Sequence, residues 1–227
     1  MTEKTCTAVI VAAGSASRMK GIDKTVAPIA GEPMILRTVK ALASSKKITE
    51  ILIVTREDLI PAVSRICRDE PKVTAVIPGG SSRSESVLHG LERASGALVA
   101  IHDGARPFVT AEIIDRTVAA AIEFGGSAPA VPVKDTIKVA EQNRVLSTPD
   151  RATLFAVQTP QIFDRQEIRS ALLRATEQGI PLTDDCSAAE WAGMPVMLTE
   201  GSEENIKITT PMDLILGEAI LQRRSQL

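Results

Sequence analysis

The chain has 227 residues, of which 44% are apolar and 24% are charged, a composition typical of globular rather than disordered proteins. Its 26 basic and 28 acidic residues leave a net charge of −2, and aromatic residues make up only 2%. A nucleic-acid partner is therefore not expected, because such proteins need a cationic face for phosphates and aromatic side chains for base stacking.

Membrane and secretory classes are also disfavoured by the sequence. No apolar run approaches the length of a membrane span, and the N-terminus lacks a secretory pattern. The three cysteines (Cys6, Cys67 and Cys186) are widely spaced and include no CxxC pair, which argues against a disulfide framework or a zinc site. We therefore expect a cytoplasmic protein.

Strand-like and helical segments alternate from the N-terminus to residue 133. Short apolar runs predict buried strands at 7–12, 50–54, 73–77, 98–102 and 127–133. Apolar residues at helical spacing predict helices at 34–43 and 59–67, one opened by the capping box Ser82-x-x-Glu85, and one running from Thr110 to Gly125.

The alternation breaks after residue 133. Short extended pieces around a polar turn predict a β-hairpin inserted at about 134–156, which we call the arm. Beyond the arm we expect a helix opened by Asp164, a helix at 184–191, a strand at 195–198, an extended piece at 205–208 and a last helix capped by Thr210.

Strands joined by helical crossovers predict an α/β fold with a doubly wound, mostly parallel sheet. We expect residues 1–227 to form a single domain that carries the arm as an insertion. Ligands of such sheets bind at the carboxyl ends of the strands. The loops that follow the strands are therefore the place to look for chemistry.

The loop after the first predicted strand runs through Ala12, Ala13, Gly14 and Ser15, with the cations Arg18 and Lys24 close behind. Small residues let backbone N–H groups approach phosphate oxygens, and the two cations add positive charge. The loop is neither a Walker A motif nor a G-x-G-x-x-G fingerprint. The alternative is a tight strand-to-helix turn with two solvated cations.

Polar residues also follow the third and fourth predicted strands. Gly79 and Gly80 precede a helix N-terminus, which attracts anionic ligands, although for this loop alone an ordinary capped helix start is the better explanation. Asp103 comes directly after a buried strand, and its carboxylate suits a Mg²⁺ ion shared with phosphates. The alternative is a turn in which Asp103 bonds only to local backbone. We expect His102 to be structural.

Six sequence blocks together resemble the 2-C-methyl-D-erythritol 4-phosphate cytidylyltransferase family, a branch of the nucleotidyltransferases with a Rossmann-like fold. They are Ala12-Ala-Gly-x-x-x-Arg-Met, His102-Asp-Gly-Ala-Arg-Pro, Asp135-Thr136, Gln158-Thr-Pro-Gln, Thr183-Asp-Asp and Glu204-Asn-Ile-Lys-Ile-Thr. The blocks occur in the family's order and span almost the whole chain. The resemblance implies a transferase that joins CTP to a polyol phosphate with Mg²⁺ and releases pyrophosphate, and a homodimer clasped by the arm.

The resemblance also implies roles for individual residues. Catalytic roles fall on Arg18, Lys24, Asp103 and Lys207, with Asp103 also near the metal. Nucleotide-binding roles fall on Ala12, Ala13, Gly14, Ser15, Gly79, Gly80, Ser86 and Gly104. Contacts with the acceptor polyol phosphate fall on Asp103, Arg106, Thr136, Arg151, Thr159 and Thr183, some of them across the dimer.

Three other functions remain open at this point. A ribitol 5-phosphate cytidylyltransferase shares most of these blocks and also takes a short polyol phosphate. A sugar-phosphate nucleotidyltransferase using UTP or GTP is a wider alternative. A non-catalytic nucleotide-binding protein on the same fold belongs to a different class, since a fold does not determine a function.

Overall fold

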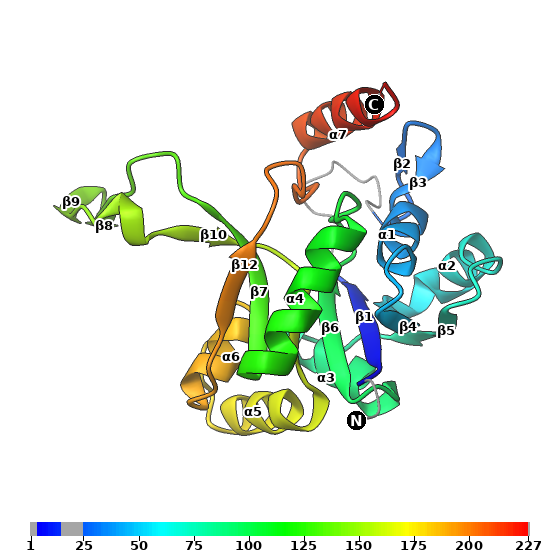
Figure 1. Ribbon diagram of the computed structural model, residues 1–227, viewed down its shortest axis with the longest axis horizontal. Coiled ribbons are helices and arrows are strands. Elements are labelled where there is room, and N and C mark those ends of the chain that lie inside the picture. Colours follow the sequence, from blue (N-terminus) through cyan, green and yellow to red (C-terminus); the bar gives the residue numbers. More distant parts are fainter. Residues whose placement is uncertain (1–3, 15–24, 227) are drawn as a thin grey trace.

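The computed structural model describes residues 4–14 and 25–226. The strands of its main sheet are β1 (Cys6–Ala12), β4 (Ile48–Thr55), β5 (Val73–Pro78), β6 (Leu98–Asp103), β7 (Gly126–Pro132), β10 (Phe155–Val157), β11 (Gln161–Asp164) and β12 (Met197–Glu200). They lie in the order β10-β7-β11-β6-β1-β4-β5, with β12 beside β7 (Figure 1).

The helices are α1 (Met34–Ala43), α2 (Ile60–Ile66), α3 (Arg83–Arg93), α4 (Ala111–Phe124), α5 (Arg165–Glu177), α6 (Asp185–Trp191) and α7 (Pro211–Arg224). Two smaller strand pairs are β2 (Pro28–Ile29) with β3 (Glu32–Pro33), and β8 (Val139–Glu141) with β9 (Arg144–Ser147). Short 3-10 turns occupy Glu57–Leu59 and Arg151–Thr153.

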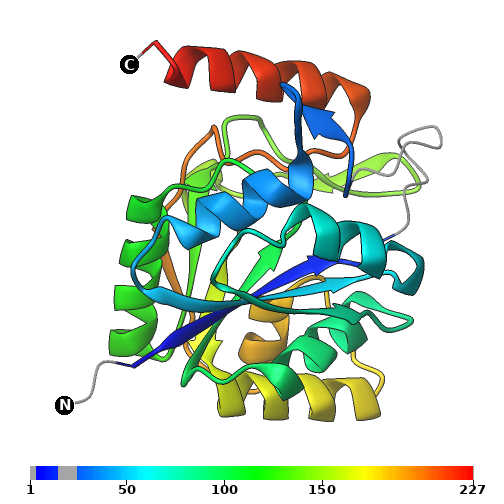
Figure 2. The ribbon, with the colours of Figure 1, turned by 90° about the vertical axis from the view of Figure 1, so that its right-hand side faces the viewer.

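Helices cover both faces of the sheet, as Figure 2 shows. Side chains of β1 alternate between the two faces, because successive residues of a strand point in opposite directions. Ala8 and Ile10 join a core with apolar residues of α1, α2 and α4, whereas Val9 joins a second core with residues of α3, α5 and α6. The two cores confirm the predicted doubly wound architecture.

The sheet is mostly parallel, with two exceptions. Strand β1 is parallel to β4 and β6, and β4 is parallel to β5, so their carboxyl ends meet at one edge. Strand β11 is antiparallel to β6 and β7, and β10 is antiparallel to β7. The chain passes from β1 to β4 and β5 on one side and then returns to place β6 on the other side. Ligands bind at such a reversal of strand order.

A small third core closes the carboxyl edge from above. Helix α7 and the β2–β3 pair pack there against Ala105 and Phe108, which follow β6. Figure 1 shows α7 lying across this edge, with the arm projecting to the side. No helix within residues 4–14 and 25–226 has the length and apolar character needed to cross a membrane.

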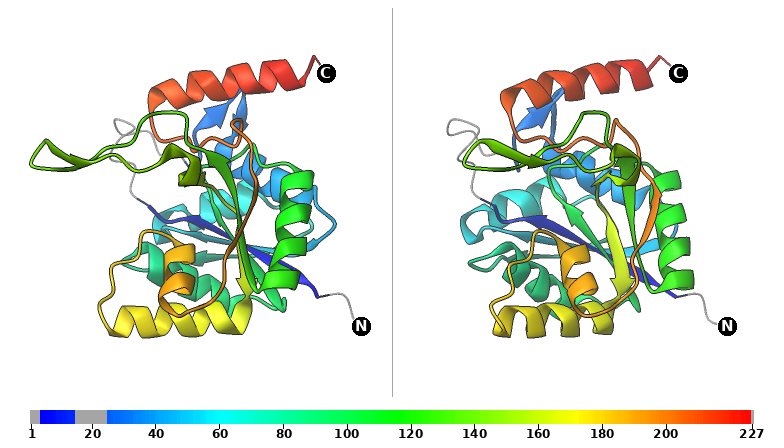
Figure 3. Two further views of the ribbon diagram at one scale, coloured as in Figure 1. Left: turned by 60° about the vertical axis from the view of Figure 1, so that its left-hand side comes forward. Right: turned by 90° about the vertical axis from the view of Figure 1, so that its left-hand side faces the viewer.

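The arm extends away from the body of the molecule, as Figures 1 and 3 show. Strands β8 and β9 pair only with each other within the part of the chain that the structure describes. Apolar side chains along the arm are exposed, namely Ile137, Val139, Val145, Leu146 and Phe155. The predicted hairpin is confirmed, and its last residues, at Phe155 and Ala156, already belong to β10 of the main sheet.

The sequence analysis missed several short strands. Strands β2, β3, β10 and β11 have two to four residues each, too few to display a periodic pattern. Strand β11 matters most, because it separates β6 from β7 and carries Gln161. The segment at 205–208 forms no strand, although its backbone still bonds to the loop after β6 through Ile208 N and Ala105 O at 2.8 Å.

Candidate functional site

A cavity of about 400 Å³ opens at the carboxyl edge of β1, β5 and β6. Residues that follow three different strands line it, together with Lys207 from the segment before α7. The predicted site residues among its lining are Ala12, Ala13, Gly14, Gly80, Ser86, Asp103, Gly104 and Lys207. The fold thus brings to one cavity residues that the sequence spreads over nearly the whole chain.

Two glycines allow the loops around this cavity to approach one another. A Cβ at Gly79 would lie 2.4 Å from the Cβ of Ala13, and one at Gly104 would lie 2.9 Å from the Cβ of Ala12. Any larger residue would push the neighbouring loops apart. These glycines therefore shape the wall of the cavity.

The start of α3 forms the second wall and is tightly bonded within itself. The Ser82 hydroxyl accepts a hydrogen bond from Glu85 N at 3.1 Å, as the predicted cap requires. The Ser86 hydroxyl accepts from Gly80 N at 3.0 Å and donates to Ser82 O at 2.9 Å. Ser86 is nearly fully buried, so its side chain holds the Gly80 loop in place.

Asp103, at the end of β6, is surrounded by cations. Its Oδ2 lies 2.7 Å from Lys207 Nζ and 3.6 Å from Arg106 Nε, and its Oδ1 lies 3.8 Å from an Arg83 nitrogen. Burial raises the pKa of Asp103, but the three cations outweigh it and leave the pKa below its ordinary value. The side chain is therefore a carboxylate, and the positive groups around it suit an anionic ligand.

Lys207 is positioned by the segment that carries it. Asn205 is fully buried and donates to Gln158 Oε1 at 3.2 Å and to Thr159 O at 3.0 Å. The Arg106 guanidinium donates to Asn205 O at 2.7 Å. These bonds tie the segment to the loops after β6 and β10, so the Lys207 ammonium reaches the cavity from a rigid base.

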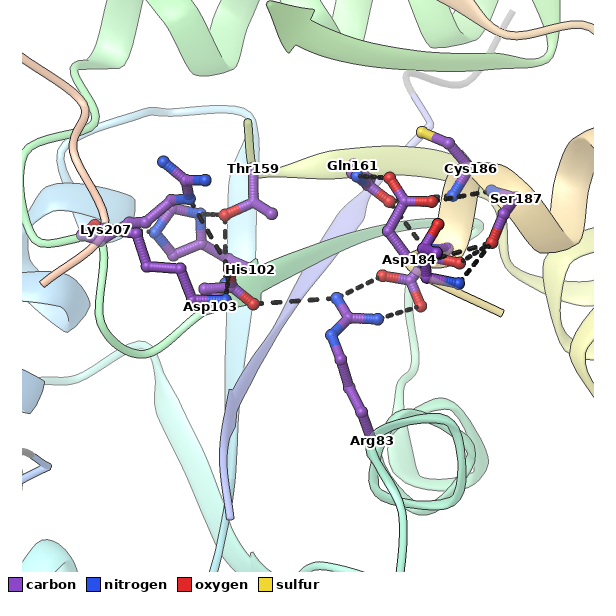
Figure 4. A network of polar contacts seen from close by, with 12 residues as sticks. Arg83, His102, Asp103, Thr159, Gln161, Asp184, Cys186, Ser187 and Lys207 are labelled. Atoms are coloured by element: carbon purple, nitrogen blue, oxygen red, sulfur yellow. Dashed lines mark hydrogen bonds and ion pairs between the residues drawn. The ribbon is translucent and has the colours of Figure 1, made fainter. Parts of the chain in front are cut away.

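Arg83 connects the cavity to α6. Its guanidinium donates two hydrogen bonds to the buried Asp185 carboxylate, at 3.0 and 2.7 Å, in a bidentate pair (Figure 4). Gln161 accepts at its side-chain oxygen from the N–H groups of Asp185 and Cys186, both at 2.9 Å. The start of α6 is thus locked to both α3 and β11.

His102 and Thr159 lie directly behind Asp103. The Thr159 hydroxyl is 3.0 Å from His102 Nδ1 and accepts from Asp103 N at 3.1 Å, and His102 Nε2 is 2.9 Å from Arg106 O. His102 is fully buried, and burial lowers its pKa to about 4 against the opposing influence of the Arg106 carbonyl and Asp103. The ring is therefore neutral at pH 7.

The remaining predicted residues that the structure describes do not line the cavity. Thr183 is exposed at the turn before α6, and Arg106 and Thr159 stand behind Asp103. Thr136 and Arg151 are exposed on the arm, where Arg151 donates to Lys134 O at 3.0 Å. Ser15, Arg18 and Lys24 lie outside the described residues.

Arg83 is the main site residue that the sequence analysis did not single out. It lines the cavity and is the cation that meets both Asp103 and Asp185. Its position in a Gly-Gly-Ser-Ser-Arg run at a helix start was the available signal. Its buried partner, Asp185, lies far away in the chain, and no sequence pattern links the two residues.

Among the described residues that line this cavity, Asp103 is the one carboxylate that a metal ion would meet. Among the described residues, no group of three or more His, Cys, Asp or Glu side chains is arranged to hold a metal. Oδ2 of Asp103 is engaged by Lys207, whereas Oδ1 has only the more distant contact with Arg83. This donor set fits Mg²⁺, which commonly takes one carboxylate and completes its shell with phosphate oxygens and water.

Comparison with known proteins extends these observations. Residues 6–223 match the family described as 2-C-methyl-D-erythritol 4-phosphate cytidylyltransferase. The chain is 43% identical to the protein of that name from Desulforamulus reducens, with 96% of each chain covered. It is also 43% identical to the one from Caldanaerobacter subterraneus, with 95% of this chain and 98% of the other covered.

Solved structures show the same fold. The 4-diphosphocytidyl-2C-methyl-D-erythritol synthase of Anaerococcus prevotii superposes with a TM-score of 0.87 at 29% identity, with 97% of each chain covered. The 2-C-methyl-D-erythritol 4-phosphate cytidylyltransferase of Thermus thermophilus gives a TM-score of 0.79 at 30% identity, with 94% of this chain and 98% of the other covered. The likeness extends over nearly the full length of each chain.

Proposed function

The chain belongs to the 2-C-methyl-D-erythritol 4-phosphate cytidylyltransferase family, and we propose that the cavity beside Asp103 is where its reaction takes place. The protein is a nucleotidyltransferase that joins CTP to 2-C-methyl-D-erythritol 4-phosphate in isoprenoid synthesis. One observation supports this location for the reaction. The Asp103 carboxylate lies at the reversal of strand order, with Lys207, Arg83 and Arg106 around it.

The reaction needs positioning and charge stabilisation more than proton transfer. An oxygen of the acceptor phosphate forms a bond to the α-phosphorus of CTP, and the bond from that phosphorus to the bridging oxygen breaks. Pyrophosphate leaves with the bonding electron pair. Because the attacking oxygen is already anionic, a general base is not required, and cations at the cavity supply the stabilisation.

We assign the cations by position. Lys207 faces the reacting phosphates, because its ammonium reaches the cavity beside Asp103. Arg106 lies on the acceptor side. Arg18 and Lys24 are assigned to the triphosphate from the family resemblance alone. The N–H groups of Ala13 and Gly14 follow β1 and would approach phosphate oxygens, with Gly80 and Ser86 toward the nucleoside.

Asp103 would hold the Mg²⁺ ion that the family resemblance implies. When bound, the metal supplies positive charge to the phosphate oxygens of CTP. Lys207 and Arg106 both contact Oδ2 of Asp103, which keeps this side chain ionised and fixes its orientation. Its other oxygen, Oδ1, then faces Arg83.

A homodimer is supported by the arm. The arm projects from the body of the molecule (Figure 3), and its apolar side chains are exposed. Thr136 and Arg151 lie on it and do not line the cavity of their own chain. In a dimer clasped by the arms, these two residues would meet the acceptor phosphate bound to the partner subunit. Thr183 would contribute from the turn before α6. Three buried free thiols fit a reducing cytoplasm.

Activity is tested by pyrophosphate release with CTP and Mg²⁺, supplying 2-C-methyl-D-erythritol 4-phosphate and ribitol 5-phosphate in parallel. We expect a clear preference for the first acceptor. A preference for ribitol 5-phosphate would agree with the fold and the mechanism but contradict the assignment of the acceptor. Pyrophosphate release from UTP or GTP at the same rate would contradict the assignment of CTP as the nucleotide.

The composite site is tested by mixing two inactive variants. Lys207→Met disables the cavity of its own chain, whereas Arg151→Gln disables the residue that reaches the partner. In a mixed dimer, one cavity has both defects and the other has neither. We expect activity to reappear on mixing, and its failure to reappear would contradict a site shared between subunits.

A further inference from the structure

A chain of hydrogen bonds runs behind Asp103 through two buried side chains. It links Asp103 N to Thr159 Oγ1 at 3.1 Å, Thr159 Oγ1 to His102 Nδ1 at 3.0 Å, and His102 Nε2 to Arg106 O at 2.9 Å. His102 is fully buried and Thr159 nearly so. Figure 4 shows both side chains on the far side of Asp103 from Arg83.

The chemistry of the end groups determines the direction of every bond. The carbonyl of Arg106 can only accept, so Nε2 of His102 carries the ring hydrogen. Nδ1 of the neutral ring is then an acceptor and takes the hydroxyl hydrogen of Thr159. The N–H of Asp103 can only donate, and it occupies a lone pair of the same hydroxyl. Thr159 therefore has no hydrogen left to donate elsewhere.

This arrangement replaces a missing strand partner. Strand β11 begins at Gln161, which pairs with Ile101, so the β11–β6 ladder ends before Asp103. The Asp103 N–H would be left without a partner at this buried position, at a cost comparable to a lost hydrogen bond. The Thr159 hydroxyl takes the place of the backbone carbonyl that a longer β11 would offer to Asp103 N.

The same series of hydrogen bonds holds both ends of the turn that carries Asp103 and Arg106. Asp103 N is bonded at one end and Arg106 O at the other, and Arg106 N donates to Asp103 O at 3.0 Å across the turn. The charged side chains of these two residues pair with each other, with Arg106 Nε 3.6 Å from Asp103 Oδ2. A change behind the turn would therefore move the carboxylate and the guanidinium together.

We infer that Thr159 and His102 are positioning residues, which set Asp103 and Arg106 for phosphate transfer through the hydrogen-bond chain behind them. The inference rests on the proposed site. It differs from a direct role for Thr159 on the acceptor phosphate. A phosphate oxygen needs a donor, and the hydroxyl hydrogen of Thr159 is already committed to His102.

Two substitutions at Thr159 separate the alternatives. Thr159→Val keeps the shape and removes the hydroxyl, so both Asp103 N and His102 Nδ1 lose their partner. We expect kcat to fall about tenfold or more, with little change in KM for the acceptor or in CTP affinity. Thr159→Ser retains the hydroxyl and should keep kcat within about twofold of the unaltered protein.

Thr117→Val is the matched control. Thr117 is a fully buried threonine in α4 whose hydroxyl bonds to Ile113 O at 2.7 Å, away from the cavity. It should lower stability and leave kcat unchanged. An acceptor KM that rises in Thr159→Val while kcat is retained would overturn the inference, because it would show direct binding. Equal losses of kcat in Thr159→Val and Thr159→Ser would overturn it as well.

A second readout does not depend on activity and leaves Thr159 and His102 unaltered. The chain contains two histidines, His89 and His102, so a ¹H–¹⁵N spectrum of His89→Gln reports on the His102 ring alone. We expect the Nε2–H tautomer at pH 7, and an Nδ1–H tautomer would overturn the inference. A protein that shows the expected tautomer but releases no pyrophosphate from CTP and acceptor would contradict the proposed function and not this hydrogen-bond chain.

Discussion

The carboxyl edge of the sheet and the arm are built in opposite ways. At the edge, Asp103 is buried and in contact with three cations, and the residues behind it are hydrogen-bonded in a continuous chain. On the arm, Val145 and Leu146 are 55% and 59% exposed, and the two strands pair only with each other among the described residues. One region is held together by buried ion pairs and hydrogen bonds, whereas the other leaves apolar side chains exposed.

The difference separates the frame around the proposed catalytic site from the exposed surface of the arm, where we propose that a second copy binds. Charged groups need a rigid, partly buried frame if they are to stabilise a transition state, and the edge provides it. Exposed apolar surface of this extent is costly in water and favours association. Four experiments test this contrast.

The largest expected effect is on stability. Phe163 is fully buried in the core between β11, α3 and α5, so Phe163→Ala should lower the free energy of unfolding by about 3–5 kcal/mol. Phe155 on the arm is 45% exposed, and Phe155→Ala should cost about 0.5 kcal/mol in dilute protein. Urea unfolding measures both. Equal losses would show that the arm is part of the core.

The next effect is on rate. Lys207→Met removes the ammonium 2.7 Å from Asp103 and should lower kcat/KM by about 10²- to 10³-fold, measured as pyrophosphate release. Lys40→Met removes a comparable surface pair with Glu32 at 2.5 Å and is the control, with unchanged kinetics expected. If both variants kept full activity, the assignment of Lys207 to the reacting phosphates would be wrong.

A third effect concerns pH. Burial lowers the pKa of His102 to about 4 from an ordinary 6.5, so the unfolded chain binds a proton at a higher pH than the folded protein. Stability should therefore be full above pH 6.5 and fall as the pH drops toward 4, by up to about 3 kcal/mol.

Unfolding by urea at pH 7 and pH 5 measures this slope. His102→Gln should reduce the change in the free energy of unfolding between pH 7 and pH 5, because the variant lacks this ring. His89→Gln is the control, because it leaves His102 in place. An identical slope in His102→Gln would show that this ring does not carry the effect.

The smallest effect is on assembly. Leu146→Ala removes an exposed apolar side chain of the arm and should weaken the proposed dimer about tenfold, as measured by sedimentation. Ile122→Ala, on the exposed side of α4 and 48% exposed, is the matched control and should leave the dimer intact. A dimer that tolerates both changes equally would place the interface away from the arm.

Much of the fold follows from local patterns in the sequence. The strands of the parallel part, the helices between them and the hairpin at 139–147 were predicted, because apolar periodicity and caps such as Ser82 act over a few residues. Strand β11 was missed because its four residues, which follow a proline and end at a capping aspartate, carry no period of their own.

The candidate site divides in the same way. Loops after strands could be predicted to converge, and Asp103, Gly80 and Lys207 do meet in one cavity. The part played by Arg83 could not be predicted, because its partner Asp185 lies 102 residues away in the chain. The direction of the Thr159 hydroxyl was equally hidden, since His102 lies 57 residues from it.

Local patterns along the chain are enough to predict the alternation of strands and helices, the insertion of the arm and the residue types available for phosphate chemistry. The folded structure was needed to learn that β6 lies next to β1, which charges face Asp103 and where each buried hydrogen points. The reason is physical. Local propensity and capping depend on neighbours along the chain, whereas burial, ion pairing and the direction of a hydrogen bond depend on neighbours in space.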